Sequence, residues 1–192
     1  MKNKKGFTLI ELLAVIVILG ILMIAAIPSI SNAITKSRKD TYVTNAKKII
    51  DAARTSMASG EVVLANENNQ VAGGICQYPD HNKTTVINLF NGSENVLPYL
   101  LERGGAKSSF GQTYKAGYVI IYNKGSEANH TDYYDYYISL VDNGGNGIST
   151  PIKEDILERK DIQTSIADLN ASNVIKIDDE TITNRYNCVI QK

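Results

Sequence analysis

The first strong pattern in the chain is an almost wholly apolar run at residues 7–27, which holds one acid, Glu11. A helix of this length measures about 30 Å and matches the hydrocarbon core of a bilayer. A carboxylate costs roughly 2.5–3.5 kcal/mol at the centre of such a helix and less towards an end, so Glu11 needs an explanation. The basic residues that precede the run are Lys2, Lys4 and Lys5. They favour a cytoplasmic N-terminus, so the pattern predicts one membrane helix and an exported remainder.

The helical pattern continues beyond the apolar run as an amphipathic helix at residues 31–59. Its apolar face has steps of three and four residues and consists of Val43, Ala46, Ile50, Ala53 and Met57. Gly60 follows the last of these residues and predicts the end of the helix. Pro28 lies inside the predicted helix and should kink it, because proline lacks an amide hydrogen and crowds the preceding turn.

Residues 60–192 predict a globular head that contains a β-sheet. Residues 118–122 are rich in β-branched and aromatic side chains, and residues 132–142 alternate between two faces, so both segments predict strands. The other expected elements are a short helix around residues 96–101, a turn at residues 143–147, a short helix at residues 151–160, and strands at residues 174–178 and 184–190. Residues 61–115 are otherwise irregular. A long helix followed by an antiparallel sheet is an α+β fold.

The composition is that of a globular protein, with 43% apolar and 21% charged residues. Basic and acidic residues number 20 each, and without the first six residues the chain would carry 17 basic and 20 acidic residues. This balance gives no support to a nucleic-acid-binding function. Neither of the two histidines is accompanied by a nucleophile or an oxyanion motif, so the sequence predicts no enzyme.

The N-terminal residues also contain a processing motif. Two lysines are followed by Gly6-Phe7-Thr8-Leu9-Ile10-Glu11, and this stretch closely resembles the cleavage motif of type IV prepilins, including those of Gram-positive bacteria. In that family a membrane peptidase cuts after the glycine and methylates the new N-terminus. The resemblance extends to Pro28. It implies a leader at residues 1–6, cleavage between Gly6 and Phe7, methylation of Phe7, and a membrane and filament-core helix at residues 7–30.

The resemblance also implies a role for Glu11. In filaments of this family, helices of neighbouring subunits pack together, and the acid faces the amine of a neighbour's first residue, here Phe7. Two opposite charges about 4 Å apart attract by about 4 kcal/mol at an effective dielectric of about 20, before desolvation. Apolar contact alone lets packed helices slide along each other, so one such charge pair would select the register in which neighbouring helices pack. The dipole at the helix N-terminus also favours a carboxylate there.

The expected product is a structural subunit of a surface filament used for adhesion, motility or aggregation. Its expected partners are further pilin subunits in a homopolymer, the prepilin peptidase and methyltransferase, and a membrane assembly platform with its ATPase motor. Four alternatives stay open: a pseudopilin of a secretion or competence system, a membrane-anchored binding protein that never polymerises, a plain signal anchor, and a secretory signal cut after Ala33.

The two cysteines, Cys76 and Cys188, predict a disulfide, because exported proteins with an even cysteine count commonly form one. A bridge that closes so long a loop would stabilise the head by about 2–5 kcal/mol. Two separate buried thiols are the alternative. Thiol labelling of the denatured, unreduced protein should find no free thiol, whereas two labelled cysteines per chain would exclude the bridge.

One acidic and glycine-rich segment, residues 142–147, has two interpretations. Its oxygen-bearing side chains could bind calcium, with Asp142, Asn146 and Asp155 as the candidate ligands. The segment is loosely similar to a calcium loop of some secretion pseudopilins, but it lacks the spacing and the terminal Glu of an EF-hand. A plain turn between two strands is the favoured interpretation, and no cofactor is expected.

Overall fold

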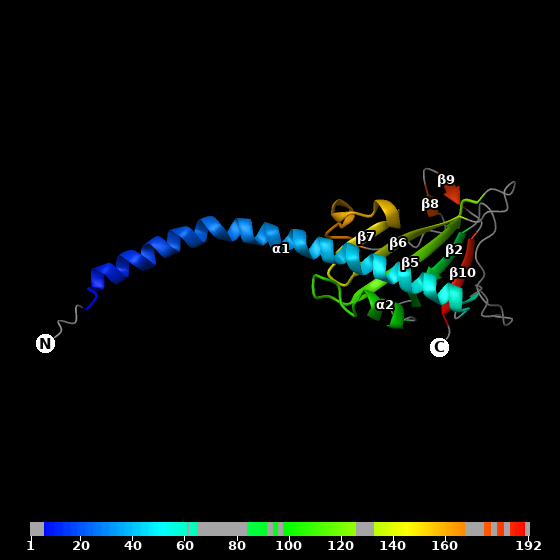
Figure 1. Ribbon diagram of the computed structural model, residues 1–192, viewed down its shortest axis with the longest axis horizontal. Coiled ribbons are helices and arrows are strands. Elements are labelled where there is room, and N and C mark those ends of the chain that lie inside the picture. The colour runs from blue at the N-terminus through cyan, green and yellow to red at the C-terminus, as the bar shows by residue number, and fades with distance from the viewer. Residues whose placement is uncertain are drawn as a thin grey trace. The chain divides into compact units, whose positions relative to one another are not determined.

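The computed structural model describes residues 6–60, 62–64, 84–91, 94–95, 98–125, 133–167, 175–177, 180–182 and 185–190 (Figure 1). The chain divides into two compact units, Met1–Arg38 and Lys39–Lys192. The first unit holds the N-terminal part of a long helix. The second, which we call the head unit, holds the rest of that helix together with the sheet and the core.

Helix α1 spans Leu9–Ser59, which confirms the long N-terminal helix that the sequence predicts. It passes through Pro28 without a break, and Figure 1 draws one continuous coil there. The kink at Pro28 stays a prediction. The helix ends where expected, because Gly60 has φ 71° and donates its N–H to the carbonyl of Met57 at 3.3 Å. Glycine adopts this left-handed conformation without a steric penalty.

The head unit contains a sheet of six strands in the order β1-β10-β2-β5-β6-β7. The strands are β1 (Val62–Leu64), β2 (Thr84–Asn88), β5 (Tyr114–Asn123), β6 (Tyr134–Asp142), β7 (Gly147–Lys153) and β10 (Arg185–Ile190). The four strands β2-β5-β6-β7 pair antiparallel, as do β1 and β10, whereas β10 pairs parallel with β2. The predicted α+β fold, a long helix followed by an antiparallel sheet, is therefore confirmed, with one parallel pairing added.

Smaller elements complete the described part of the head unit. Helix α2 (Pro98–Gly104) confirms the short helix expected around residues 96–101. Two short ladders join β3 (Phe90–Asn91) to β4 (Glu94–Asn95) and β8 (Ile175–Ile177) to β9 (Glu180–Ile182). After β7 come two turns of 3-10 helix, η2 (Glu154–Ile156) and η3 (Arg159–Asp161).

The core lies between α1 and one face of the sheet. In Figure 1 the second half of α1, in cyan, runs across β5 and β6. Its buried apolar residues are Tyr42, Ala46, Ile49, Ile50, Ala52, Ala53 and Met57, whereas Val43 is only partly buried. From β6, Ile138 and Leu140 join this core, and Tyr137 packs on the other face with Ile120 of β5. The alternation at residues 132–142 is therefore confirmed, with apolar side chains on both faces.

The short helix predicted at residues 151–160 is wrong. Strand β7 continues to Lys153 and only 3-10 turns follow. Ile148 is fully buried and Ile152 packs against the same core, so tertiary contacts hold this segment extended. Pro151 is tolerated because β7 is the last strand of the sheet and one side of it needs no ladder partner.

The turn predicted at residues 143–147 is confirmed, since it joins β6 to β7. Gly147 ends this turn with φ 151°, and a Cβ atom there would lie 2.0 Å from the carbonyl oxygen of Leu140 and 2.7 Å from the hydroxyl of Tyr42. Only glycine permits this approach between the turn, β6 and α1.

Candidate functional site

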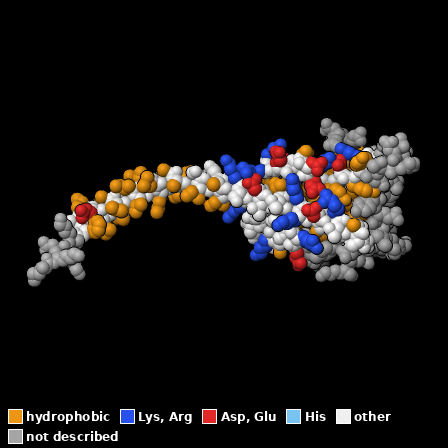
Figure 2. Space-filling model, viewed as in Figure 1, with side chains coloured by type: hydrophobic (Ala, Val, Ile, Leu, Met, Phe, Trp, Pro, Cys, Tyr) orange, Lys and Arg blue, Asp and Glu red, His pale blue; other side chains and the backbone are white. Residues whose placement is uncertain are grey.

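The N-terminal part of α1 presents large apolar side chains that no other described part of the chain covers. Between Phe7, which is 90% exposed, and Ile34, every large apolar side chain is exposed. In Figure 2 these side chains, in orange, follow the helix on the visible face. Among the described residues, α1 is the one helix long and apolar enough to cross a membrane. Such a surface is stable only when lipid or the apolar surface of another chain removes it from water.

Gly6 and Phe7 precede the first helical residue and are both exposed. A Cβ atom built on Gly6 would have no other atom within 4 Å. The peptide bond between these two residues is therefore accessible to an enzyme. The packing of the chain itself does not require a glycine at position 6.

Thr8 and Glu11 form a capping box at the start of α1. The Oε2 atom of Glu11 accepts hydrogen bonds from the backbone N–H and from the hydroxyl of Thr8, both at 2.8 Å. In return, the backbone N–H of Glu11 donates to the Thr8 hydroxyl at 3.4 Å. The first turn of a helix has N–H groups without intrahelical partners, and this arrangement satisfies two of them. Glu11 is thus partnered within its own chain before any assembly.

The capping box leaves part of the Glu11 carboxylate available. Both bonds from Thr8 go to Oε2, and Oε1 accepts no hydrogen bond from any residue that the structure describes. An amine from a second chain could therefore approach Oε1 without breaking the cap. The sequence analysis did not predict the capping role of Thr8. The sequence does contain a signal for it, because Thr8-Leu9-Ile10-Glu11 has the spacing of a capping box ahead of an apolar run.

Residues 1–27 match the family model described as the prokaryotic N-terminal methylation motif. They are a type IV prepilin signal. The search of curated proteins and the search of solved structures each find no match. The prepilin signal stands at the head of an α+β layout that is pilin-like, and it indicates a structural protein of the pilin or pseudopilin kind rather than an enzyme. Together with the apolar helix, the signal is consistent with membrane anchoring.

In the head unit, the acidic candidate Asp142 holds the turn between β6 and β7. It is fully buried, and its Oδ1 accepts hydrogen bonds from the N–H groups of Gly144 and Asn146 at 2.9 and 2.8 Å. Its Oδ2 accepts from the hydroxyl of Ser108 at 2.6 Å. The amide of Asn146, a second candidate ligand, also donates to this carboxylate. The two side chains therefore bond each other, and the arrangement is that of a turn fixed by its first residue.

Asp142→Ala should lower the free energy of unfolding by about 2–4 kcal/mol, because buried donors lose a charged acceptor. Asn143→Ala is the matched control in the same turn, since the Asn143 side chain makes one exposed bond to the Thr113 hydroxyl. Its cost should stay below about 1 kcal/mol. Urea denaturation of the full chain in detergent measures the free energy of unfolding of both variants. If Asn143→Ala lowered it as much as Asp142→Ala does, Asp142 would not be the residue that fixes the turn. A rise in Tm on adding calcium that Asp142→Ala removes would instead support calcium binding.

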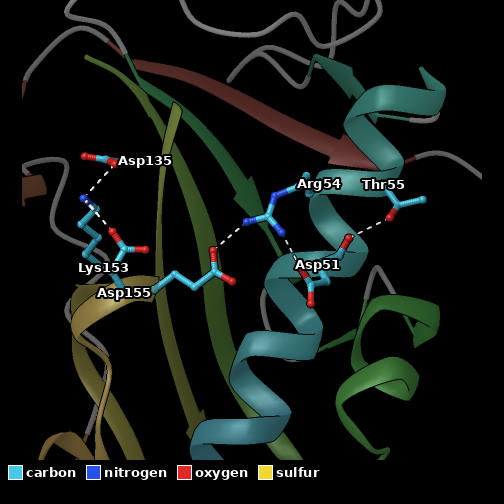
Figure 3. A network of polar contacts seen from close by, with 7 residues as sticks. Asp51, Arg54, Thr55, Asp135, Lys153 and Asp155 are labelled. Carbon is cyan, nitrogen blue, oxygen red and sulfur yellow. Dashed lines mark hydrogen bonds and ion pairs between the residues drawn. The ribbon is translucent and has the colours of Figure 1, made fainter. Parts of the chain in front are cut away.

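The third candidate ligand, Asp155, belongs to a different set of contacts. The ammonium of Lys153 lies 3.0 Å from the carboxylate of Asp155 and 2.9 Å from that of Asp135 (Figure 3). Asp135 also pairs with Lys124 at 2.9 Å. Burial raises the pKa of Asp135, but hydrogen bonds from Lys153 and Lys124 outweigh it and hold that pKa below its usual range. The ionised Asp135 therefore stabilises the folded head unit at neutral pH, and this contribution to the free energy of unfolding is lost as the pH falls below about 4. Among the residues that the structure describes, no three His, Cys, Asp or Glu side chains gather as a metal site would require.

Figure 3 also shows how α1 is tied to η2, which directly follows β7. Arg54 reaches from α1 to Glu154 at 2.6 Å and pairs with Asp51 one turn earlier on the helix. Its guanidinium lies 4.3 Å from the ring centroid of Tyr136 on β6. Each of these contacts is partly exposed and individually weak. Together they fix the second half of α1 against the sheet.

The predicted disulfide lies outside the described residues. Cys76 is not among them, and for Cys188 only the backbone position in β10 is described, opposite Leu64 of β1 and Ile87 of β2. The bridge stays a prediction.

Proposed function

We propose that this protein is a structural subunit of a type IV pilus. The observation that carries the proposal is a prepilin signal at the head of a helix whose large apolar side chains are all exposed as far as Ile34. Membrane lipid would cover this surface before assembly, and the helices of neighbouring subunits would cover it in a filament. The head unit would then face the outside and serve adhesion, motility or aggregation.

In the proposed pathway the prepilin peptidase hydrolyses the bond between Gly6 and Phe7, and the new amine of Phe7 is methylated. A positive amine now stands four residues before Glu11. The free Oε1 of Glu11 supports pairing with the Phe7 amine of a neighbouring subunit, because the capping bonds to Thr8 use the other oxygen. Such a pair in a filament core without water would stabilise one register of the packed helices over the others.

The proposed partners follow from this pathway. They are the prepilin peptidase and methyltransferase, a membrane assembly platform with its ATPase motor, and further copies of the same chain. The N-terminus would lie in the cytoplasm, since the leader holds three lysines and the apolar run begins directly after it.

Electron microscopy of material sheared from cells tests the proposal. Cells that produce this chain should carry filaments, a deletion strain that retains its other genes should lack them, and the reintroduced gene should restore them. If filaments persist in the deletion strain while secretion or DNA uptake fails, the chain is a pseudopilin. If neither filaments nor transport change, the chain is a membrane-anchored protein that does not polymerise.

A further inference from the structure

The turn at residues 143–147 contains two Asn-Gly pairs, Asn143-Gly144 and Asn146-Gly147. Asparagine is chemically labile, and it deamidates most readily before glycine, which has no side chain to shield its backbone nitrogen. That nitrogen attacks the side-chain carbonyl carbon of the asparagine. How the fold holds these two groups therefore decides which pair reacts. The side chain of Asn91, in a third pair, lies outside the described part of the structure.

The pair Asn146-Gly147 is held on both sides. The N–H of Gly147 donates to the carbonyl of Gln163 at 3.0 Å, and the N–H of Gln163 donates back at 2.8 Å. The amide of Asn146 donates to the two carboxylate oxygens of Asp142 at 3.2 and 3.3 Å. Gly147 is also buried, and a Cβ atom there would lie 2.0 Å from the carbonyl oxygen of Leu140. A ring formed at this nitrogen has no room, so the fold protects Asn146.

The pair Asn143-Gly144 is exposed to water at both residues. The side-chain amide of Asn143 donates to the hydroxyl of Thr113 at 2.6 Å, at the surface. A Cβ atom on Gly144 would first meet the side chains of Asn146 and Gln112, at 2.9 and 3.1 Å, and not the backbone. Water and hydroxide can therefore reach both reacting groups, and only flexible side chains surround them.

One contact restrains the reaction at Asn143. The N–H of Gly144 donates to Oδ1 of Asp142 at 2.9 Å. The attacking nitrogen must give up its proton, and a carboxylate beside it disfavours the negative charge that results. Asp142 therefore slows the attack by a hydrogen bond and by its charge, but no packing of the kind found at Gly147 prevents it.

We propose that Asn143 is a site of spontaneous deamidation in the folded head unit, that Asp142 restrains its rate, and that Asn146 is protected. In the first step the nitrogen of Gly144 forms a bond to Cγ of Asn143 and loses its proton. The bond from Cγ to Nδ2 breaks, and ammonia leaves with that proton. Water then opens the cyclic imide at either of its two carbonyls. The products carry aspartate or isoaspartate at position 143, and water is the only co-reactant.

Either product alters a turn that holds the head unit's part of α1. The carbonyl of Asn146 accepts a hydrogen bond at 3.2 Å from the hydroxyl of Tyr42, which is fully buried. The new carboxylate at position 143 would stand next to that of Asp142, and isoaspartate adds one carbon to the main chain of the turn. Protein aged in solution should therefore unfold at a lower urea concentration than fresh protein. The inference does not depend on the proposed function.

Mass spectrometry of the full chain, incubated in detergent micelles at mildly alkaline pH, tests the proposal. Trypsin releases residues 125–153 as one peptide, so fragmentation of that peptide compares both asparagines in the same molecule. Deamidation at Asn143 should proceed at least about tenfold faster than at Asn146, because several contacts protect Asn146. In the chain denatured with guanidinium chloride, the two rates should agree to within about twofold, because both sites are then free Asn-Gly pairs.

Four variants separate the causes. Thr113→Val releases the amide of Asn143 and should speed its deamidation by about two- to tenfold. Thr150→Val is the matched control, the same change at an exposed threonine of β7, and should leave the rate unchanged. Asp142→Ala should speed deamidation at Asn143 by about tenfold or more, because a charged acceptor is lost. Gly144→Ala should slow it by about tenfold or more, because a methyl group shields the attacking nitrogen.

Three results would overturn the proposal. If Asn143 stays intact in the folded chain while the denatured chain reacts fully, it is not a deamidation site. If Asn146 reacts as fast as Asn143 in the folded chain, the fold does not protect it. If Asp142→Ala speeds deamidation equally at both asparagines, Asp142 acts through the stability of the head unit and not on Gly144. Equal rates for Thr113→Val and Thr150→Val would show that the bond to Thr113 does not restrain Asn143.

Discussion

Glu11→Ala should remove the protein from sheared surface material while its amount in the membrane stays at the wild-type level. Insertion should become easier by up to a few kcal/mol, because a charge leaves the apolar run. The head unit should keep its stability, since the hydrogen bonds of Glu11 within the described chain go to Thr8 alone. What is lost is the partner of a buried amine, and an uncompensated charge in a dry interface costs about 3–5 kcal/mol.

Two further variants separate the charge of Glu11 from its capping role. Glu11→Gln keeps an acceptor for the Thr8 N–H but has no charge, so it should fail to assemble or assemble only weakly. Thr8→Val removes the hydroxyl of the cap and keeps the carboxylate, so it should cost about 1 kcal/mol of helix stability and still assemble. The ratio of sheared to membrane-bound protein, measured by immunoblotting in cells without other copies of the gene, ranks the variants. Wild-type ratios for both Glu11 variants would mean that the carboxylate serves only the membrane-bound helix.

Gly6→Val should leave the leader attached to essentially all of the protein. Position 6 is exposed and has free space around it, so the change does not disturb the chain itself and acts at the peptidase. Glycine lets an enzyme approach the backbone closely, and a β-branched side chain beside the scissile bond prevents this. With the leader attached, the nitrogen of Phe7 is an uncharged amide and cannot pair with Glu11. Unprocessed chains should therefore be absent from sheared material.

Gly20→Val provides the control for this change. A Cβ atom added to Gly20 would also meet no atom within 4 Å beyond the adjacent residues and the backbone of its own helix, but this residue lies well inside α1 and away from the cleaved bond. The leader of this variant should be removed at the wild-type rate. Normal cleavage of Gly6→Val, judged by the mobility and mass of the protein in the membrane fraction, would show that the peptidase does not require glycine.

The N-terminal helix could be predicted from the sequence because its signals are local. The apolar run, the spacing of residues such as Ala46 and Ile50, and Gly60 at the end each act within a few turns. The strand at β6 followed from its alternation for the same reason. The helix predicted at residues 151–160 is wrong because its first residues pair with β6, Ile152 opposite Ile138 and Lys153 opposite Tyr137, and such contacts arise only in the folded chain.

The candidate functional residues likewise include some that have a local signal in the sequence and some that do not. Gly6, Phe7 and Glu11 are close in sequence and form a recognisable motif, and the capping role of Thr8 has a local signal too. The ion pair between Asp40 and Arg159 has no such local signal, because these residues stand 119 residues apart and meet only in the folded chain. The role of Asp142 likewise depends on Ser108, which a separate segment brings to the turn.

The proposal that this protein is a filament subunit is tested most directly by mass spectrometry of the N-terminal peptide of protein sheared from the cell surface. We expect a peptide that begins at Phe7, carries one methyl group on its amine, and retains Glu11 and the apolar run. A peptide that begins at Ile34 would establish ordinary signal cleavage, and one that begins at Met1 would show that the motif is not processed. Either result would contradict the proposal that this helix forms the core of a filament.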